Sequence, residues 1–497
     1  MKRYPIVAIT IAAAILRLIA VFFAGDYTVD DSFSIHFASM KPAQMFSFLK
    51  FEVHPPLYYL LLHFWLMVLG DNPMITRLLS VIFSVAAVPL IYYLGKEIAT
   101  TWVGIVSSLI LTLSYFSIFN AIQVRMYSLV GFLGLLSLTL FWLIAVKQKK
   151  KLTLLYLLVN ILTLFTHLGG ILSLATQWLW ILILQWQKRI DRRTVKNLLL
   201  QQLPALLLWL AWFELFFWPV LPTLMSLGWH FNLASSHSVS IGLYDFFFLL
   251  LRNYWLRLFT GTIIFSAPLL VLLWSDKMRL RQLAQPTNPG WFMFAWAIPG
   301  FFLSVVTDIG ITRIFIISYL GFVVLVAYCF WLMRSAWRNF FVVLITGWFS
   351  ISMYTTATNI TNRLSRWDQI IRYIAATERP NDTIILYSSI EELPFHRYYS
   401  GITPHISLYP FDDDKTMEQR IVEHNWQNYI VGSQLKQIAA VDDAQRIIMI
   451  HELDTLRNTY VQQPIHQWMV NRQWHMKSIY QPKALFGPTV IVYTHDR

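Results

Sequence analysis

The sequence predicts a polytopic α-helical membrane protein with about 11 transmembrane helices, juxtamembrane helices in a long first external loop, and a small C-terminal α/β domain outside the membrane. Three observations lead to this fold class. Hydrophobic residues make up 57% of the 497-residue chain and charged residues only 13%, well below the roughly 25% usual in soluble proteins. Apolar runs of membrane-spanning length recur within residues 1–358. Residues 359–497 are instead rich in charged and polar side chains.

The apolar runs define the spans, because a helix needs about 20 mostly apolar residues to cross the hydrocarbon core. The run from Leu57 to Leu69 is too short and lies between Pro55-Pro56 and Gly70. We therefore expect it to be a juxtamembrane helix, together with shorter helices at 32–40 and 43–51. The predicted spans are 5–23, 74–95, 102–120, 127–146, 152–168, 170–187, 198–220, 255–274, 290–307, 312–333 and 338–357.

The basic residues fix the orientation of these spans. Cytoplasmic loops carry an excess of Lys and Arg. If Leu57 to Leu69 does not cross, all the basic clusters face the cytoplasm, whereas a crossing there moves every cluster after the first outside. The N-terminus is then cytoplasmic, and the first loop (24–73) and the tail are extracytoplasmic. The clusters lie at residues 2–3, 96, 147–151, 188–193, 277–281 and 334–338.

The formal net charge of +13 is explained by the same clusters. Because they are short and lie beside apolar runs, we expect membrane lipids as partners and no nucleic acid. Cys329 is the only cysteine, so an intrachain disulfide and a cysteine metal site are excluded. Lys2-Arg3 before an apolar run resembles a signal peptide, but no small-residue cleavage site follows. We expect a retained first helix in a bacterial inner or plasma membrane.

The tail, 359–497, alternates short β-prone runs with helix-prone stretches. The β-prone runs are 383–387, 447–450 and 490–493, and the helix-prone stretches are 391–399 and 415–425. This alternation is typical of a small α/β domain. We assign no site to it.

Asp30 and Asp31 follow the first span, where the chain leaves the lipid. One interpretation is structural, because an aspartate before Ser32 can cap a helix. The other is that one carboxylate acts as a general base at the membrane surface. A neighbouring carboxylate and partial burial are expected to raise its pKa toward a useful range.

Other polar groups interrupt the apolar pattern at the same membrane face. His54 precedes Pro55-Pro56 and is either incidental to a turn or a phosphate contact. Arg125, beside Tyr127, either snorkels to headgroups or binds a phosphate through its fork of donors. Arg313 invites the same two interpretations. For His167 we prefer a packing role.

These features resemble the GT-C fold polyprenyl-phosphate-dependent glycosyltransferases of family 39, which include protein O-mannosyltransferases and the lipid A aminoarabinose transferase. The resemblance covers about the first 335 residues. It rests on the acidic pair, the element at 54–59, Arg77 with the span that follows it, the segment 123–129, Thr166-His167 and Thr312-Arg313.

The resemblance implies transfer of a sugar from an undecaprenyl- or dolichyl-phosphate donor to an extracytoplasmic lipid, glycan or protein acceptor, with inversion at the anomeric carbon. Asp30 matches the family's catalytic aspartate. Asp31 stands where many members have glutamate, and His54 where some have lysine. No metal or cofactor is assigned, although a divalent ion stays an open alternative. The residues expected to bind substrate are Asp31, His54, Tyr58, Arg125, Tyr127, His167 and Arg313.

Two other classes of function fit a polytopic chain. A transporter or lipid flippase also needs many spans and buried charges, but the charged residues here gather at one face and no half-repeat is visible. A receptor or assembly protein would bind its partner through the tail and would not depend on Asp30.

Overall fold

The computed structural model describes residues 4–48, 54–219, 285, 288–306, 312–333, 365–387, 391–408, 444–451, 464–482 and 488–495. Two predicted spans, 255–274 and 338–357, and the predicted tail helix at 415–425 lie outside these residues.

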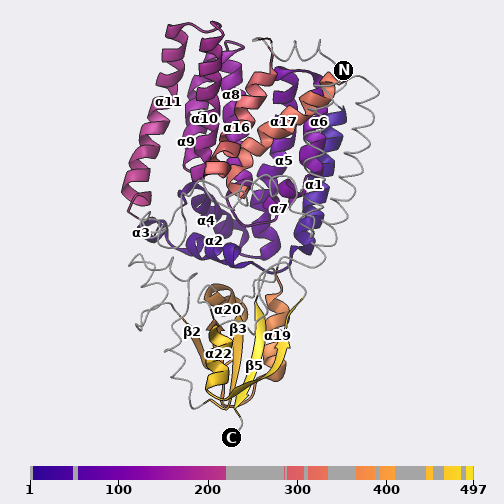
Figure 1. The fold of residues 1–497 in the computed structure, drawn as a ribbon, viewed down its shortest axis with the longest axis vertical. Coiled ribbons are helices and arrows are strands. Elements are labelled where there is room, and N and C mark those ends of the chain that lie inside the picture. The colour runs from indigo at the N-terminus through magenta and orange to yellow at the C-terminus, as the bar shows by residue number, and fades with distance from the viewer. Residues whose placement is uncertain are drawn as a thin grey trace.

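An up-and-down bundle of apolar helices forms the larger part of the molecule (Figure 1). Within the described ranges, five helices are long and apolar enough to cross a membrane, or six if the bent pair α6 and α7 is one span. Each of the nine predicted spans in these ranges corresponds to a helix or to this pair. The helices are α1 (Tyr4–Ala24), α5 (Pro73–Ile98), α6 (Thr101–Leu113), α7 (Tyr115–Ala121), α8 (Tyr127–Ala145), α9 (Thr153–Leu164), α10 (Ile171–Trp186), α11 (Arg192–Trp212), α16 (Gly290–Val306) and α17 (Ile316–Leu332).

The two ends of the bundle differ. The first loop, α7 and the tail lie at one end, and the loops after α8 and α10, which carry the basic residues at 147–151 and 188–193, lie at the other (Figure 1). The charge pattern predicted this separation.

The third predicted span is broken at Ser114, where α6 and α7 meet at a bend of 58°. A break inside lipid leaves helix carbonyls without partners, and these must be satisfied by protein groups. Arg17 of α1 does this, because its guanidinium donates to the carbonyls of Leu111 (3.2 Å) and Thr112 (3.4 Å). Arg17 is fully buried, so a charged side chain within the bundle stabilises the bend. The bend directs the chain after α7 into the segment 122–126.

The first loop contains three helices, α2 (Val29–Ser39), α3 (Pro42–Phe48) and α4 (Leu57–Leu69). The predicted helix at 57–69 is confirmed, and α2 begins three residues earlier than expected. Phe64, Met67 and Val68 of α4 are 58%, 70% and 80% exposed. Such an apolar surface is typical of a helix that lies on lipid.

The tail contains a five-stranded mixed sheet in the order β2-β1-β3-β5-β4. The first three strands in this order are parallel, and β5 is antiparallel to β3 and β4. All three β-prone runs are strands, and the stretch at 391–399 contains a helix; β2 and β4 were not predicted. The elements are α19 (Trp367–Thr377), β1 (Asp382–Tyr387), α20 (Glu392–Tyr398), β2 (His405–Leu408), β3 (Arg446–His451), α22 (Pro464–Asn471), β4 (Trp474–Tyr480) and β5 (Thr489–His495).

Candidate active site

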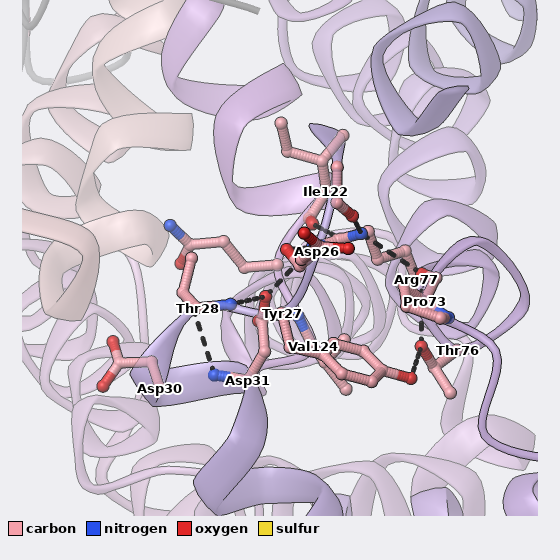
Figure 2. Close-up of polar contacts among 12 residues, drawn as sticks. Asp26, Tyr27, Thr28, Asp30, Asp31, Pro73, Thr76, Arg77, Ile122 and Val124 are labelled. Carbon is pink, nitrogen blue, oxygen red and sulfur yellow. Dashed lines mark hydrogen bonds and ion pairs between the residues drawn. The ribbon is translucent and has the colours of Figure 1, made fainter. Parts of the chain in front are cut away.

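A capping box fixes the start of α2 and separates the two acidic residues. Thr28 is the N-cap: its hydroxyl accepts from the backbone N–H of Asp31 (3.2 Å), and its own N–H donates to the Asp31 carboxylate (3.1 Å). Thr28, and not Asp31, therefore caps the helix. Because consecutive helical residues point about 100° apart, Asp30 cannot share the direction of Asp31. Figure 2 shows Asp30 turned away from the polar cluster around Arg77.

Asp31 is a fully buried structural carboxylate. One oxygen accepts from Arg77 (3.2 Å) and from Thr28, and the other accepts from the backbone N–H of Val124 (2.7 Å). A buried charge persists only when it is paired and hydrogen-bonded in this way. Both oxygens are engaged within the protein, so this geometry gives no support to the prediction that Asp31 contacts substrate.

Arg77 joins the segments that frame the site (Figure 2). It is fully buried and pairs with Asp31. Its other bonds are to the backbone carbonyls of Gly25 (2.7 Å), Asp26 (2.8 Å), Pro73 (3.4 Å) and Ile122 (2.8 Å). One guanidinium thus binds four segments: the end of α1, the first loop, the start of α5 and the segment 122–126.

Asp30 lies on the open side of α2 and is 41% exposed. Its carboxylate accepts from Arg313 at 2.8 Å. Arg313 also donates to the Gln123 side-chain oxygen (3.3 Å) and lies over the ring of Tyr127, 5.0 Å from its centroid. Residues separated by 283 positions in the chain therefore meet at one point.

Two histidines continue the site from Tyr127. The ring centroid of His167 lies 5.5 Å from that of Tyr127 and 5.5 Å from that of His54. The Nδ1 atom of His167 accepts from the backbone N–H of Gly169 at 2.9 Å. An imidazole that accepts through Nδ1 carries its proton on Nε2. His167 is therefore oriented as a hydrogen-bond donor through Nε2, which packing alone does not require.

Arg125 and Tyr58 occupy the buried side of the site. Arg125 is 7% exposed and donates to the hydroxyl of Ser34 (3.4 Å). The hydroxyl of Tyr58 lies 3.3 Å from that of Ser80, which in turn donates to the backbone carbonyl of Arg125 (3.3 Å). Tyr58 is fully buried. It therefore supports the backbone of Arg125, and the geometry gives no support to a direct substrate contact.

The charges around Asp30 act on its protonation. Partial burial alone would raise the pKa of Asp30, but the charges of Arg125 and Arg313, the hydrogen bond from Arg313 and the neighbouring His54 lower it to about 2. The expectation of a raised pKa is therefore wrong. The reason is that the neighbouring carboxylate, Asp31, faces Arg77, whereas Asp30 faces two guanidinium groups.

The structure brings together Asp30, His54, Arg125, Tyr127, His167 and Arg313, and it adds Gln123 and Ser34. Gln123 was visible in the sequence as a polar residue beside Arg125, but its partner Arg313 was not. Among the described residues, no group of three or more His, Cys, Asp or Glu side chains could hold a metal ion.

No protein-family model and no curated protein matches the sequence at a significant level. Solved structures match over nearly all of it. ArnT from Cupriavidus metallidurans bound to undecaprenyl phosphate has a TM-score of 0.54 at 12% identity, over 98% of this chain and 97% of that one. The archaeal oligosaccharyltransferase AglB from Archaeoglobus fulgidus, in complex with an inhibitory peptide and a dolichol-phosphate, has a TM-score of 0.52 at 10% identity, over 100% and 75%. This chain has the same fold, so the predicted GT-C fold of an integral membrane protein is confirmed.

Proposed function

We propose that this protein transfers a sugar from a polyprenyl-phosphate donor to an acceptor on the extracytoplasmic side of the membrane, with Asp30 as the general base. One observation carries the proposal: a solvent-accessible carboxylate lies against Arg313 (2.8 Å) and near Arg125, at the end of the bundle that also carries the tail. The two similar structures support it, since one holds undecaprenyl phosphate and the other a dolichol-phosphate.

The donor's physical chemistry explains why such a site lies at the membrane surface. The polyprenyl chain stays in the bilayer, so the phosphate and the anomeric carbon lie at the interface. Arginine binds phosphate through paired donors. Arg125, Arg313 and the Nε2–H of His167 are the groups that would hold the phosphate. The helix α4, whose exposed apolar residues would border the lipid, lies at the same end of the bundle.

The proposed reaction is a single displacement. The acceptor oxygen or nitrogen attacks the anomeric carbon as its proton passes to the Asp30 carboxylate, and the bond between that carbon and the phosphate oxygen breaks. The electron pair leaves with the polyprenyl phosphate, whose developing charge is stabilised by the two arginines. One displacement inverts the anomeric configuration. Released polyprenyl phosphate, measured with purified protein and a synthetic polyprenyl-phosphate sugar, tests the reaction; movement of intact lipid between leaflets would indicate transport instead.

Donor binding should change the basicity of Asp30. The pKa of about 2 in the donor-free protein makes the carboxylate a weak base, although it is ionised at every physiological pH. A bound phosphate shares the charge of Arg125 and Arg313, so the pKa of Asp30 rises in the complex. Donor binding would thus both place the anomeric carbon and strengthen the base.

The pH profiles test this coupling. Activity is lost as pH falls through the pKa of the base, and kcat/KM reports the free enzyme whereas kcat reports the complex. We expect the kcat/KM profile to show no limb from Asp30 above about pH 4, and the acid limb of kcat to lie at least about one pH unit higher than that of kcat/KM. The measurement is made in His54→Asn, so that this imidazole contributes no limb of its own. Coincident limbs would contradict the coupling.

Arg125→Ala is expected to raise the KM for the donor about tenfold, because a hydrogen bond to a charged group contributes roughly 1.5–3 kcal/mol. The control is Arg193→Ala, which removes the same charge from an exposed position at the opposite end of the bundle. Steady-state kinetics at varied donor concentration measures both. An unchanged donor KM in Arg125→Ala would remove this residue from the phosphate site.

A further inference from the structure

The tail is joined to the first loop by a set of polar contacts that the proposed reaction does not use. The backbone N–H of Tyr27 donates to the hydroxyl of Tyr398 at 3.0 Å. The N–H of Asp368 donates to the Asp26 carboxylate at 2.8 Å, and Gly25 forms an isolated parallel β-bridge with Ser365. These contacts place α19 and α20 of the tail directly against residues 25–27.

Arg397 extends the same interface. It pairs with the carboxylate of Asp71 (2.9 Å) and donates to the backbone carbonyl of that residue (3.0 Å). Its guanidinium also lies over the ring of Tyr27, 4.7 Å from the centroid. Tyr27 is fully buried, and its hydroxyl bonds to Thr76 (2.9 Å). We call this set of residues the clasp: Gly25, Asp26, Tyr27 and Asp71 of the first loop with Ser365, Asp368, Arg397 and Tyr398 of the tail.

The clasp acts on the segment that leads into the acidic pair. Tyr27 directly precedes Thr28, the residue whose capping box sets the start of α2 and hence the direction of Asp30. On its other side the segment is held by Arg77, which binds the carbonyls of Gly25 and Asp26. Residues 25–27 are therefore fixed between the bundle and the tail.

The phosphate-binding arginines depend on other segments. Arg125 lies in the segment after α7, and Arg313 lies in the short helix Thr312–Phe315 before α17. A change in the clasp acts first on residues 25–28 and Asp30, and it reaches the two arginines only through Arg77 and the ion pair of Asp30 with Arg313. It should therefore affect the chemical step more than donor binding.

We propose that Tyr398 is a positioning residue for Asp30, and that the tail is a working part of the active site because the clasp holds the start of α2 in place. This inference rests on the proposed function. Displacement of a base by about 1 Å can cost up to about 100-fold in rate, and Tyr398→Phe leaves a buried backbone N–H without its acceptor.

The experiment compares Tyr398→Phe with Tyr399→Phe in the full-length protein. The two variants lose hydroxyls from adjacent residues, the last residue of α20 and the one after it, but among the described residues the Tyr399 hydroxyl bonds to groups of the tail, Glu378 (3.0 Å) and the N–H of Thr403 (3.1 Å). We expect Tyr398→Phe to lower kcat about tenfold with the donor KM within about twofold of wild type. Tyr399→Phe should leave both constants within about twofold of wild type. An equal loss of kcat in the two variants, or no loss in either, would overturn the proposal.

Hydrogen exchange gives a second readout that needs no activity. Amides of residues 27–31 should exchange about tenfold faster in Tyr398→Phe than in wild type or Tyr399→Phe. Faster exchange in a protein without transferase activity would retain the clasp and reject the proposed function. Unchanged exchange would reject the clasp whatever the activity.

Arg397→Gln provides a second variant in case Tyr398→Phe folds poorly. It removes the pairing with Asp71 and the contact with Tyr27, and it should produce the same lowered kcat and faster exchange. Its control is Arg379→Gln, which removes an exposed arginine of the tail that does not belong to the clasp. An Arg397→Gln protein with wild-type kcat and wild-type amide exchange at residues 27–31 would contradict the inference.

Discussion

Asp30→Asn is expected to lower kcat for sugar transfer at least about 100-fold, the usual contribution of a general base. The amide keeps the shape of the side chain but cannot accept the acceptor's proton. Donor binding should be retained or become tighter, because Arg313 loses its anionic partner and is free to bind phosphate. The measurements are kcat with a synthetic polyprenyl-phosphate sugar and the shift in thermal midpoint on adding undecaprenyl phosphate.

The control for Asp30→Asn is Asp191→Asn at the opposite end of the bundle. Asp191 caps α11 and accepts from the N–H of Thr194, and asparagine caps a helix about as well as aspartate. Activity should therefore be unchanged in Asp191→Asn. More than a few per cent of wild-type activity in Asp30→Asn would reject Asp30 as the base.

Much of the bundle could be predicted from the sequence, because the bilayer constrains features that are visible along the chain. Span length follows from bilayer thickness, and the ends of the bundle follow from the positions of Lys and Arg. The short run from Leu57 to Leu69 was predicted correctly on length and charge together. The break at Ser114 was not predicted, since the residues on either side are apolar and the compensating group, Arg17, lies about 95 residues away in the chain.

The site was predicted in part for a related reason. Asp30, Arg125 and Arg313 were recognisable as polar residues at the ends of apolar runs, but a sequence does not show which charges face one another. Asp31 pairs with Arg77, which lies 46 positions away in the chain. This pairing reverses the expected direction of the pKa shift of Asp30. With Asp31 neutralised by its own partner, the charges that Asp30 faces are positive and its pKa falls.

Substitution of the two adjacent acidic residues should therefore have different effects: Asp31→Asn should lower stability, and Asp30→Asn should lower activity. Asp31→Asn is expected to destabilise the fold by about 3–5 kcal/mol, because it leaves Arg77 as a buried charge without an anionic partner. In either orientation the amide also places its NH2 against another donor, the N–H of Thr28 and the guanidinium of Arg77 or else the N–H of Val124. We expect a lower yield of monodisperse protein and a lower thermal midpoint, measured by size-exclusion chromatography after heating.

The comparison with Asp30→Asn separates the two roles. The ion pair of Asp30 with Arg313 is partly exposed, so its loss should cost no more than about 1 kcal/mol and leave the thermal midpoint nearly unchanged. Asp31→Asn protein that does fold should keep the Asp30 carboxylate and thus turn over at a measurable rate. If Asp31→Asn is instead as stable as wild type but inactive, Asp31 and not Asp30 is the group that meets the substrate. In that case Asp31 would have the catalytic role that we assign to Asp30.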